Sequence, residues 1–324
     1  MTEPEALLAV DNLQVEVETR YGTGKAVDGV SFVLRAGETL GLVGESGSGK
    51  SMTSLAILGL QPRPAARVVG GEIRFRGEDL LRLSPRDLRR YRGRHIAMVL
   101  QDPMTALNPV FSIGRQLYEP LQLHTRLSGS ALRQRAADLL RQLHIPSPEA
   151  RLADYPHQLS GGMRQRVVGA IALSCAPEVL IADEPTTALD VTVQALYLKL
   201  LNDIQRQTGL AILFITHDFA VVARMCDRVA VMYAGRIVET ASARVLFEHP
   251  AHPYTEALLQ SVPDLHKPAD ELPSIKGSPP SIYNRPAGCP FAPRCAYAMP
   301  RCRTEYPAEV TVAEGHSTSC WRYM

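Results

Sequence analysis

A glycine-rich stretch near the N-terminus has the residue types and spacing that bind phosphate. The pattern of Gly, four residues, Gly, Lys and then Ser or Thr occurs at Gly44-Glu45-Ser46-Gly47-Ser48-Gly49-Lys50-Ser51. In such a loop, backbone N–H groups surround the β- and γ-phosphates, and the N-terminus of the next helix adds its positive dipole. The Lys50 ammonium reaches the terminal phosphates, and the Ser51 hydroxyl binds Mg²⁺. The sequence therefore predicts a site for a nucleoside triphosphate and Mg²⁺.

The segments on either side of this loop fit that chemistry. Residues 39–43 form a short apolar run, which predicts a buried strand, and residues 49–60 have the pattern of a helix. Glycine suits the loop between them because the backbone must approach the phosphates closely and adopt positive φ. We therefore expect a strand, a phosphate loop and a helix in this order.

Two further apolar runs end in residues that could act on a phosphate. Residues 179–182 precede the adjacent carboxylates of Asp183 and Glu184, and residues 211–215 lead to His217. Continuous apolar runs of this length suit strands that are buried on both faces of a parallel sheet. Asp183, at the end of such a strand, can hold Mg²⁺ through its water shell. Glu184 is one residue further on and so points in a different direction.

The remaining pattern places these runs in an α/β fold. Apolar and polar residues alternate in 7–43, which predicts antiparallel strands, and residues 71–100 are also strand-like. Residues 112–175 have helical periodicity. Residues 229–233 and 236–239 predict a hairpin. Helices that separate buried strands indicate an α/β sheet.

Charge and hydropathy exclude several classes of protein. The 35 basic and 33 acidic residues give a net charge of +2, so no global field favours nucleic acid. The arginines of residues 82–94 are interpreted as a solvated helical face rather than a basic patch. The chain has no apolar run of the ~18–20 residues that span a membrane. Its N-terminus lacks the pattern of a secretion signal. We expect a cytosolic protein that reaches a membrane only through a partner.

The six cysteines fall into two groups. Cys175 and Cys226 lie inside apolar segments and are predicted to be inert core residues. The other four lie near the C-terminus, after a proline-rich change of composition that marks a domain boundary near 262–285. They are Cys289, Cys295, Cys302 and Cys320.

Two more motifs complete an ordered set. Gln101 follows the apolar run that ends at residue 100, and Ser160-Gly161-Gly162 opens an apolar helix. With the phosphate loop, Asp183-Glu184 and His217, this order resembles the ATP-binding subunit of an ABC transporter over residues 7–262. The resemblance implies an ABC-type P-loop NTPase with a RecA-like parallel sheet core, an antiparallel β subdomain and an α-helical subdomain at about 102–175. Residues 1–262 would form this ATP-binding domain, and residues 263–324 a small Cys-rich C-terminal extension.

The resemblance also implies roles for single residues. Glu184 would polarise the attacking water, while His217 and Lys50 act on the γ-phosphate. Mg²⁺ would be bound by Ser51, Gln101 and Asp183. Two subunits would pack head to tail, so that the Ser160 motif of each closes over the ATP of the other. Its fifth residue is Met163 instead of the usual Gln, a mild departure because the backbone and Ser160 carry the contact. The nucleotide-contacting residues implied in this way are Tyr21, which would stack on adenine, Gly44, Glu45, Ser46, Gly47, Ser48, Gly49, Lys50, Ser51, Met52, Gln101, Ser160, Gly161, Gly162, Asp183 and Asp190.

Three segments resemble one branch of the family, the dipeptide and oligopeptide importers with their nickel and glutathione relatives. They are residues 101–109, 252–259 and 288–295. This branch implies a peripheral subunit on the cytoplasmic face of the cell (inner) membrane that powers peptide import. Its partners would be a homologous but different second ATP-binding subunit, two transmembrane permease subunits and, indirectly, an extracytoplasmic substrate-binding protein. Nickel, glutathione or another small solute are alternative cargoes. A non-transport ABC ATPase is disfavoured because the chain lacks long coiled-coil insertions and tandem domains.

The four C-terminal cysteines have the spacing C-x5-C-x6-C-x17-C. This differs from the two close pairs of zinc ribbons and from bacterial ferredoxin spacing. A cytosolic location disfavours disulfides. Some peptide-importer ATP-binding subunits with a similar tail carry a [4Fe–4S] cluster, and the resemblance implies one on Cys289, Cys295, Cys302 and Cys320. Zinc and unligated thiols remain alternatives. A bound group would act mainly as a structural staple.

Overall fold

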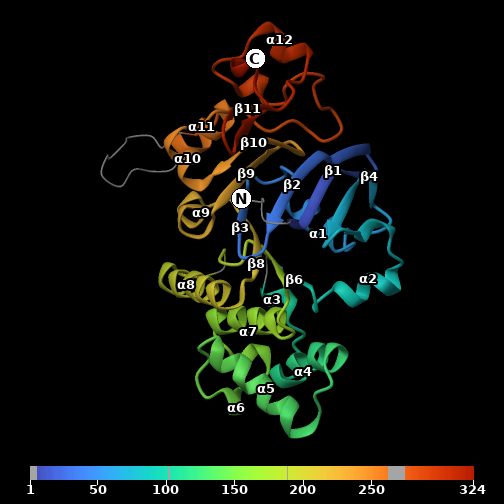
Figure 1. Cartoon of the computed structure of the whole chain (residues 1–324), viewed down its shortest axis with the longest axis vertical. Coiled ribbons are helices and arrows are strands. Elements are labelled where there is room, and N and C mark those ends of the chain that lie inside the picture. The colour runs from blue at the N-terminus through green and yellow to red at the C-terminus, as the bar shows by residue number, and fades with distance from the viewer. Residues whose placement is uncertain (1–5, 101–102, 188, 262–273) are drawn as a thin grey trace. The chain divides into compact units, whose positions relative to one another are not determined.

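The computed structural model describes residues 6–100, 103–187, 189–261 and 274–324 (Figure 1). The chain divides into two compact units. The first unit contains residues 34–38 and 82–214, and the second contains residues 8–33, 39–81 and 215–324. The phosphate loop belongs to the second unit, whereas Asp183 and Glu184 belong to the first.

An antiparallel sheet in the second unit confirms the alternating pattern near the N-terminus. It contains β1 (Ala6–Thr19), β2 (Gly22–Arg35), β4 (Ala66–Phe75) and β5 (Glu78–Asp79) in the order β2-β1-β4-β5. The apolar side chains that alternate along β1, among them Leu13 and Val15, are fully buried. Each strand therefore presents one face to the core, as period-two alternation requires.

A second sheet carries the phosphate loop. β3 (Thr39–Val43) is buried along its whole length and pairs in parallel with β9 (Arg228–Tyr233). β9 pairs antiparallel with β10 (Arg236–Ser242), and the turn between them contains Ala234 and Gly235 at positive φ. The predicted hairpin is confirmed. The helices of this region are α1 (Lys50–Ile57), α9 (Phe219–Met225), α10 (Ala243–Glu248) and α11 (Pro253–Gln260), with a 3₁₀ turn η1 (Leu80–Arg82).

Residues 274–324, the C-terminal segment, extend the same sheet. β12 (His316–Thr318) pairs antiparallel with β10, and β11 (Val310–Ala313) pairs with β12 (Figure 1). Short helical turns precede and follow these strands, namely η3 (Ala292–Arg294), α12 (Pro300–Thr304) and η4 (Trp321–Tyr323). The cysteine-bearing segment is therefore joined to the sheet through backbone hydrogen bonds as well as side chains.

The first unit contains parallel strands and a group of helices. β6 (Ile96–Val99) and β7 (Val179–Asp183) are parallel, and β8 (Ala211–Thr216) follows β7 in the sheet and ends at the boundary of the unit. The helical periodicity predicted for 112–175 is confirmed, since Leu132, Leu139 and Leu140 are buried on one face of α5. The helices are α2 (Pro85–Tyr91), α3 (Pro103–Ala106), α4 (Ile113–His124), α5 (Gly129–Gln142), α6 (Pro148–Arg151), η2 (Pro156–Gln158), α7 (Gly161–Leu173) and α8 (Val191–Thr208).

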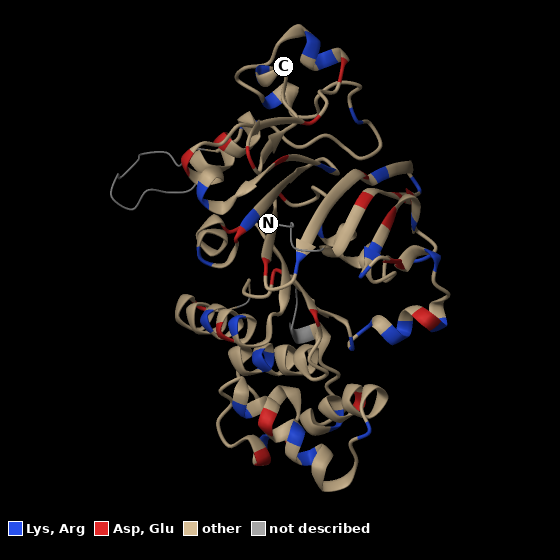
Figure 2. Ribbon diagram, viewed as in Figure 1, with Lys and Arg blue, Asp and Glu red and all other residues tan. Residues whose placement is uncertain are grey.

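Helix α2 shows where the strand-like interpretation of 71–100 was wrong. Ser84 caps this helix by accepting a hydrogen bond from the Asp87 N–H at 3.2 Å, and Pro85 occupies its first turn. Both are helix-start signals that outweigh the apolar residues nearby. Figure 2 shows basic and acidic residues together on α2, where Arg90 pairs with Asp87 at 3.7 Å. The interpretation of this arginine cluster as a solvated helical face is confirmed, because Arg86, Arg89 and Arg90 are exposed.

In the described part of the chain, no helix combines the length and the apolar character needed to cross a membrane.

Candidate nucleotide-binding site

The phosphate loop runs from the end of β3 into α1, as the sequence predicts. Its backbone has φ of +150° at Gly44 and +107° at Gly49. A Cβ at Gly44 would lie 2.1 Å from the Met232 carbonyl oxygen, and one at Gly49 would lie 2.5 Å from that of Ala26. Neighbouring strands therefore leave no room for a side chain at either position. Glycine is needed here for both space and backbone conformation.

Lys50 lies at the N-terminus of α1 and its side chain folds back over the loop. The buried Nζ donates to the carbonyl oxygens of Gly44 at 2.7 Å and Glu45 at 2.9 Å, with the Ser48 Oγ at 3.4 Å. The ammonium is thus held by backbone oxygens of the loop that would surround the phosphates. A cation held in this place can neutralise an incoming triphosphate without large rearrangement. Ser51 and Met52 follow it in the first turn of α1 and are half-buried.

His217 is exposed directly after β8 in the second unit. The next residue, Asp218, caps α9 by accepting from the N–H of Ala220 at 2.8 Å and of Val221 at 3.3 Å. The cap fixes the turn that follows the strand. This turn therefore presents His217 to solvent at a strand end, where a switch residue could meet a ligand.

The two carboxylates of the first unit differ in setting although they are adjacent. Asp183 is the last residue of the fully buried strand β7 and is itself 4% exposed. Glu184 has a left-handed backbone, with φ of +47°, and accepts a hydrogen bond from the Thr187 Oγ1 at 3.1 Å. Positive φ is rare for a side chain of this size and concentrates at functional sites. That the two side chains point in different directions stays a prediction.

Two helix starts in the first unit carry further predicted residues. Ser160 caps α7 by accepting from the Met163 N–H at 3.3 Å, and it is exposed together with Gly161. A Cβ at Gly162 would lie 2.8 Å from a methyl group of Val193, so a side chain there would have to displace Val193. Asp190 caps α8 through the Val193 N–H at 2.9 Å. An exposed, capped helix N-terminus with bare glycine backbone is suited to an anion.

Tyr21 and Gln101 are the remaining predicted residues. Tyr21 follows β1, is 69% exposed and lies under the Arg20 guanidinium, 4.7 Å from its ring centroid. Its ring is available for stacking, and that role stays a prediction. Gln101 lies outside the described residues. The structure brings together the loop, Lys50 and Ser51 within the second unit, and places Asp183, Glu184 and Ser160 within the first.

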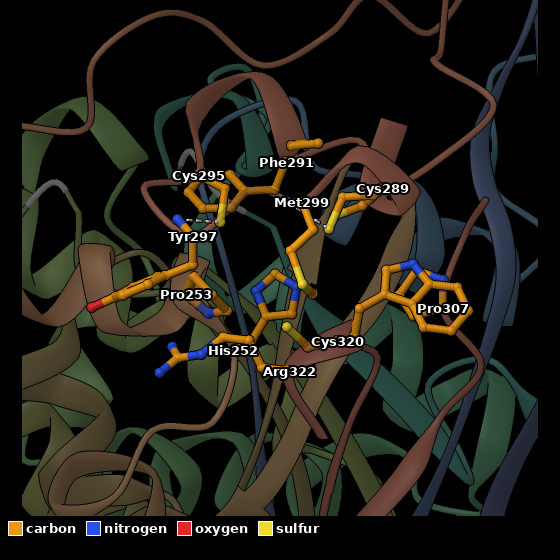
Figure 3. Close-up of a pocket in the computed structure, with 13 residues that line it drawn as sticks. His252, Pro253, Cys289, Phe291, Cys295, Tyr297, Met299, Pro307, Cys320 and Arg322 are labelled. Carbon is orange, nitrogen blue, oxygen red and sulfur yellow. Dashed lines mark hydrogen bonds between the residues drawn. The ribbon is translucent and has the colours of Figure 1, made fainter. Parts of the chain in front are cut away.

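The four C-terminal cysteines line one pocket. Figure 3 shows Cys289, Cys295 and Cys320 around the His252 imidazole, and Cys302 lines the same pocket. Burial raises the pKa of the Cys289 thiol to about 11 and also raises the pKa values of the Cys295 and Cys320 thiols. Among the described residues, no set of three His, Cys, Asp or Glu side chains forms a group that could hold a metal ion. The cysteines thus share one pocket without a ready-made metal site.

Two residues of the segments that resemble the peptide-importer branch were not predicted as site residues. His252 is 2% exposed and accepts the Tyr254 N–H at its Nδ1, and burial lowers its pKa to about 3. Arg294 forms an ion pair with Glu45 of the phosphate loop. Its only sequence signal is its place between Cys289 and Cys295, and the partner in the loop lies too far along the chain to be inferred from spacing.

A phosphate loop that joins a buried parallel strand to a helix places the chain among the P-loop NTPases. Comparisons with known proteins narrow this class. A family model described as ABC transporter matches residues 27–187, and one described as Oligopeptide/dipeptide transporter, C-terminal region matches residues 238–302. The chain belongs to the ABC transporter family of ATP-binding proteins, and it is an ATPase coupled to transport.

Curated relatives match nearly the whole chain. A probable peptide ABC transporter ATP-binding protein of Sinorhizobium fredii is 50% identical over 98% of this chain and 95% of its own length. The dipeptide transport ATP-binding protein DppD of Bacillus subtilis is 50% identical, again over 98% of this chain and 95% of the relative. The DppD of Escherichia coli is 48% identical over 97% of this chain and 96% of the relative.

Solved structures confirm the ABC ATPase fold. The ATP-binding cassette MJ0796, in a dimeric post-hydrolysis state bound to ADP and Pi, aligns with a TM-score of 0.66 at 26% identity. It covers 73% of this chain and 99% of that protein. The cbiO1 protein of Clostridium perfringens, part of an ABC transporter complex, aligns with a TM-score of 0.63 at 28% identity over 76% of this chain and 92% of its own.

Proposed function

We propose that this ATPase powers the import of dipeptides and oligopeptides across the cytoplasmic membrane. The observation that carries the proposal is the presence, in one chain, of an intact phosphate loop and of the oligopeptide/dipeptide transporter C-terminal region at residues 238–302. Relatives with about half of their residues identical are described as peptide or dipeptide transport proteins, which supports the same cargo class. Nickel, glutathione or another small solute are the alternative cargoes.

The site residues suggest how ATP would be used. Lys50 and the loop N–H groups would hold the β- and γ-phosphates, and Ser51, Gln101 and Asp183 would hold Mg²⁺. Glu184 would orient the attacking water, and His217 would contact the γ-phosphate. Phosphoryl transfer to water needs positioning and charge neutralisation more than covalent chemistry, and these residue types supply both.

The assembly that we propose contains two such subunits. The exposed Ser160 cap would close over the ATP of a homologous second subunit, so that ATP binding joins the pair and hydrolysis releases it. The pair would dock on two transmembrane permease subunits at the cytoplasmic face, with an extracytoplasmic protein delivering the peptide. Tyr21 and Asp190 would complete the nucleotide contacts.

The test uses Glu184→Gln in the transporter assembled in proteoliposomes. We expect the variant to bind ATP with unchanged affinity and to lose ATP turnover by more than about a hundredfold, because water is no longer oriented. Glu149→Gln makes the same exchange at an exposed surface residue and should leave turnover unchanged. Normal hydrolysis by the Glu184 variant would remove this residue from the mechanism.

The cargo is tested separately in the same vesicles. Radiolabelled dialanine, nickel and glutathione are offered in turn with ATP inside the compartment that holds the ATPase. We expect ATP-dependent uptake of the dipeptide that stops in the Glu184→Gln variant. Uptake of nickel or glutathione without dipeptide would assign the chain to the alternative cargo.

We also propose that residues 263–324 form a Cys-rich extension that binds a [4Fe–4S] cluster through Cys289, Cys295, Cys302 and Cys320. The shared pocket supports this, because all four cysteines line it and such a cluster needs four sulfur ligands, although the thiols would have to close in on the cluster. When bound, the cluster would supply a covalent staple to a segment with a small core of its own.

An anaerobic absorption spectrum, with iron, sulfide and zinc measured on the same sample, tests this proposal. We expect a shoulder near ~400 nm and about four irons per chain. A colourless sample with one zinc or with no metal would overturn it and leave the ATPase assignment intact.

A further inference from the structure

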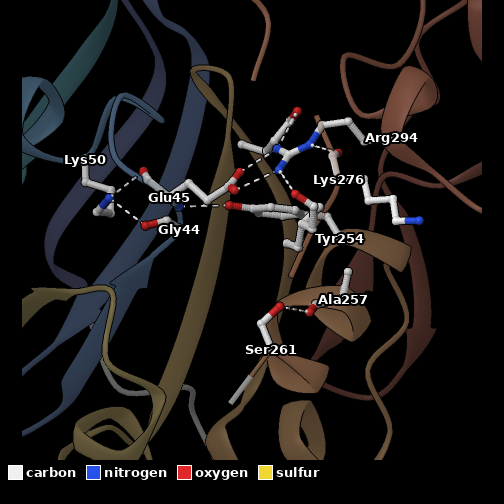
Figure 4. A network of polar contacts seen from close by, with 10 residues as sticks. Gly44, Glu45, Lys50, Tyr254, Ala257, Ser261, Lys276 and Arg294 are labelled. Atoms are coloured by element: carbon white, nitrogen blue, oxygen red, sulfur yellow. Dashed lines mark hydrogen bonds and ion pairs between the residues drawn. The ribbon is translucent and has the colours of Figure 1, made fainter. Parts of the chain in front are cut away.

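Arg294 of the C-terminal segment forms hydrogen bonds with the phosphate loop. The Arg294 guanidinium donates to Glu45 with both Nη atoms, at 2.7 Å from Nη1 to Oε2 and at 2.9 Å from Nη2 to Oε1 (Figure 4). This is the bidentate geometry in which Arg–carboxylate pairs are strongest. The Arg294 side chain is 5% exposed, so solvent screens the pair only weakly.

Every N–H of this guanidinium has an acceptor. Besides the two bonds to Glu45, Nη1 donates to the Tyr233 hydroxyl at 3.3 Å, Nη2 to the Ile275 carbonyl at 3.2 Å and Nε to the Lys276 carbonyl at 3.1 Å. A guanidinium has five N–H donors, and all five are used here. Lysine could not reproduce this arrangement. The hydrogen bonds that Arg294 donates to Glu45 raise the pKa of Arg294 further above its ordinary value.

The residue that Arg294 holds is connected to the phosphate-binding lysine. The Glu45 N–H donates to the Tyr254 hydroxyl at 2.8 Å, and the Glu45 carbonyl accepts from the Lys50 Nζ at 2.9 Å. Figure 4 shows this line of contacts from Arg294 through Glu45 to Lys50. A shift of the Arg294 side chain would therefore move Glu45, the second residue of the loop, and through it the Lys50 ammonium that would neutralise the phosphates.

The charge of Glu45 needs a counter-ion in this place. A carboxylate in the loop that receives a triphosphate repels it, because like charges repel strongly where the effective dielectric constant is low. Arg294 cancels that charge and also fixes the backbone on which the loop N–H groups lie. Preorganised donors bind an anion without an ordering cost at the moment of binding.

We propose that Arg294 is a positioning residue for ATP binding, through which the C-terminal segment neutralises and orders the phosphate loop. Arg294 acts through Glu45 and does not itself touch the nucleotide in this proposal. The proposal concerns ATP affinity alone, so it depends neither on the transported cargo nor on a cluster at the cysteines.

The test measures ATP affinity of the purified full-length chain and the KM and kcat of the assembled transporter. Arg294→Gln leaves the carboxylate without a counter-ion, and we expect the Kd and KM for ATP to rise about tenfold with kcat within about twofold of the wild type. Adding Glu45→Gln removes the repelling charge, and the double variant should recover at least roughly threefold of the lost affinity. A mere structural tether predicts no such recovery.

Controls separate this effect from general damage. Arg301→Gln makes the same exchange in the same segment at an exposed arginine that pairs with Glu305, and its ATP affinity should equal that of the wild type. Arg294→Lys keeps the charge without the bidentate geometry and should weaken ATP binding by roughly threefold, which keeps the test available if Arg294→Gln does not fold. Unchanged affinity in both Arg294 variants, or a double variant no better than Arg294→Gln, would overturn the proposal.

Discussion

Two glycines of the phosphate loop meet different constraints. Gly49 has φ of +107° and a Cβ there would lie 2.5 Å from the Ala26 carbonyl oxygen, whereas Gly47 has φ of +78° and open space around it. A side chain at Gly49 would be strained by the positive φ and would also clash with Ala26. A side chain at Gly47 would be strained by the positive φ alone. Comparing substitutions at the two positions therefore separates the cost of the clash from the cost of the backbone conformation.

Alanine at these positions gives the first prediction. Gly47→Ala should lower the free energy of unfolding by about 1 kcal/mol, the usual cost of a left-handed side-chain residue. Gly49→Ala should lower it by about 3 kcal/mol or more, because the loop and the Ala26 carbonyl of β2 must also move apart. Urea unfolding without nucleotide measures both. Equal losses would mean that the loop relaxes and the clash is not real.

Asp28 gives a prediction about pH. It accepts hydrogen bonds from Arg236 at 2.6 Å, Arg285 at 2.7 Å and Lys25 at 3.2 Å. Burial raises the pKa of Asp28, but the bond and charge of Arg236, with the other two cations, outweigh it and leave the pKa below 3.8. The folded state therefore favours the charged form. This stabilisation is fully present above the pKa of the unfolded chain, near 4, and is lost as pH falls through the folded value.

The matching variant is Asp28→Asn. At pH 7 we expect its free energy of unfolding to be lower than that of the wild type by about 2 kcal/mol, since two arginines lose their carboxylate at a partly buried site. The difference should shrink as pH falls below 4, because the unfolded wild-type chain then takes up a proton at Asp28, and the folded carboxyl follows at its lowered pKa. Urea unfolding at several pH values measures it, and a difference that stays constant down to pH 3 would contradict the assignment.

At the scale of an element, helix α7 depends on Ser160 in two ways. The hydroxyl accepts the Met163 N–H, which stabilises the helix start, and the same exposed end is the proposed contact for a partner's nucleotide. Ser160→Ala should cost about 1 kcal/mol of stability through the lost cap. Ser160→Asp keeps the cap and suits the helix dipole, but it puts a carboxylate where the phosphate would bind.

These two substitutions therefore separate folding from function. We expect Ser160→Asp to unfold at the wild-type temperature and to lose ATP turnover in the assembled transporter, whereas Ser160→Ala loses part of both. Thermal unfolding and ATP hydrolysis measure the two quantities. Full turnover by the Asp variant would show that Ser160 is only a cap.

The elements show which patterns can be read from sequence. β7, β8 and the β9–β10 hairpin were predictable because each is a run of apolar residues with a clear end, and the Ala234-Gly235 turn is marked by its glycine. Helix α2 was missed because it is short and its N-terminal signals, Ser84 and Pro85, lie within a strand-like stretch of sequence. The pairing of β12 with β10 was not predictable, since a three-residue strand has no period and its partner lies more than seventy residues away.

The same division holds within the candidate site. The positions of Lys50, Ser51, Asp183 and Glu184 were predictable because each follows from local order along one strand, loop or helix. The positive φ of Glu184 and the ion pair between Glu45 and Arg294 were not, because they depend on packing between segments far apart in the chain. The motif at residues 288–295 could be identified from the sequence. The pairing of its Arg294 with Glu45 could not.

At the scale of the whole second unit, polar attachments join the C-terminal segment to both sheets and to the phosphate loop, and three of them are ion pairs of buried or partly buried side chains. Arg285 pairs with Asp28 of β2, Arg294 pairs with Glu45 of the phosphate loop, and His316 donates to or accepts from Glu239 of β10 at 2.8 Å. Together with the β10–β12 pairing, they make the segment part of the same folded body. Loss of one attachment should therefore affect the others.

Glu239 is the most enclosed of these attachments and gives the last prediction. Its carboxylate is 1% exposed and accepts the backbone N–H of Ala251 at 2.7 Å and of His252 at 2.8 Å, besides facing the His316 Nε2. Glu239→Gln replaces one acceptor oxygen by an NH₂ donor, so at least one buried N–H loses its partner at a cost of about 1–3 kcal/mol.

The cost should appear first in the C-terminal segment, because β12 and the start of α11 are the elements that these bonds hold. We expect faster amide hydrogen exchange at residues 310–318 in Glu239→Gln, while exchange in β1 and β4 stays near the wild type. Glu248→Gln, at an exposed residue paired with Arg244, is the matched control. If Arg294 depends on this attachment, the ATP Kd also rises in the Glu239 variant. Uniform acceleration of exchange throughout the second unit would instead mean that the segment and the sheet unfold only together, and Glu239 would then set global stability rather than hold the segment in place.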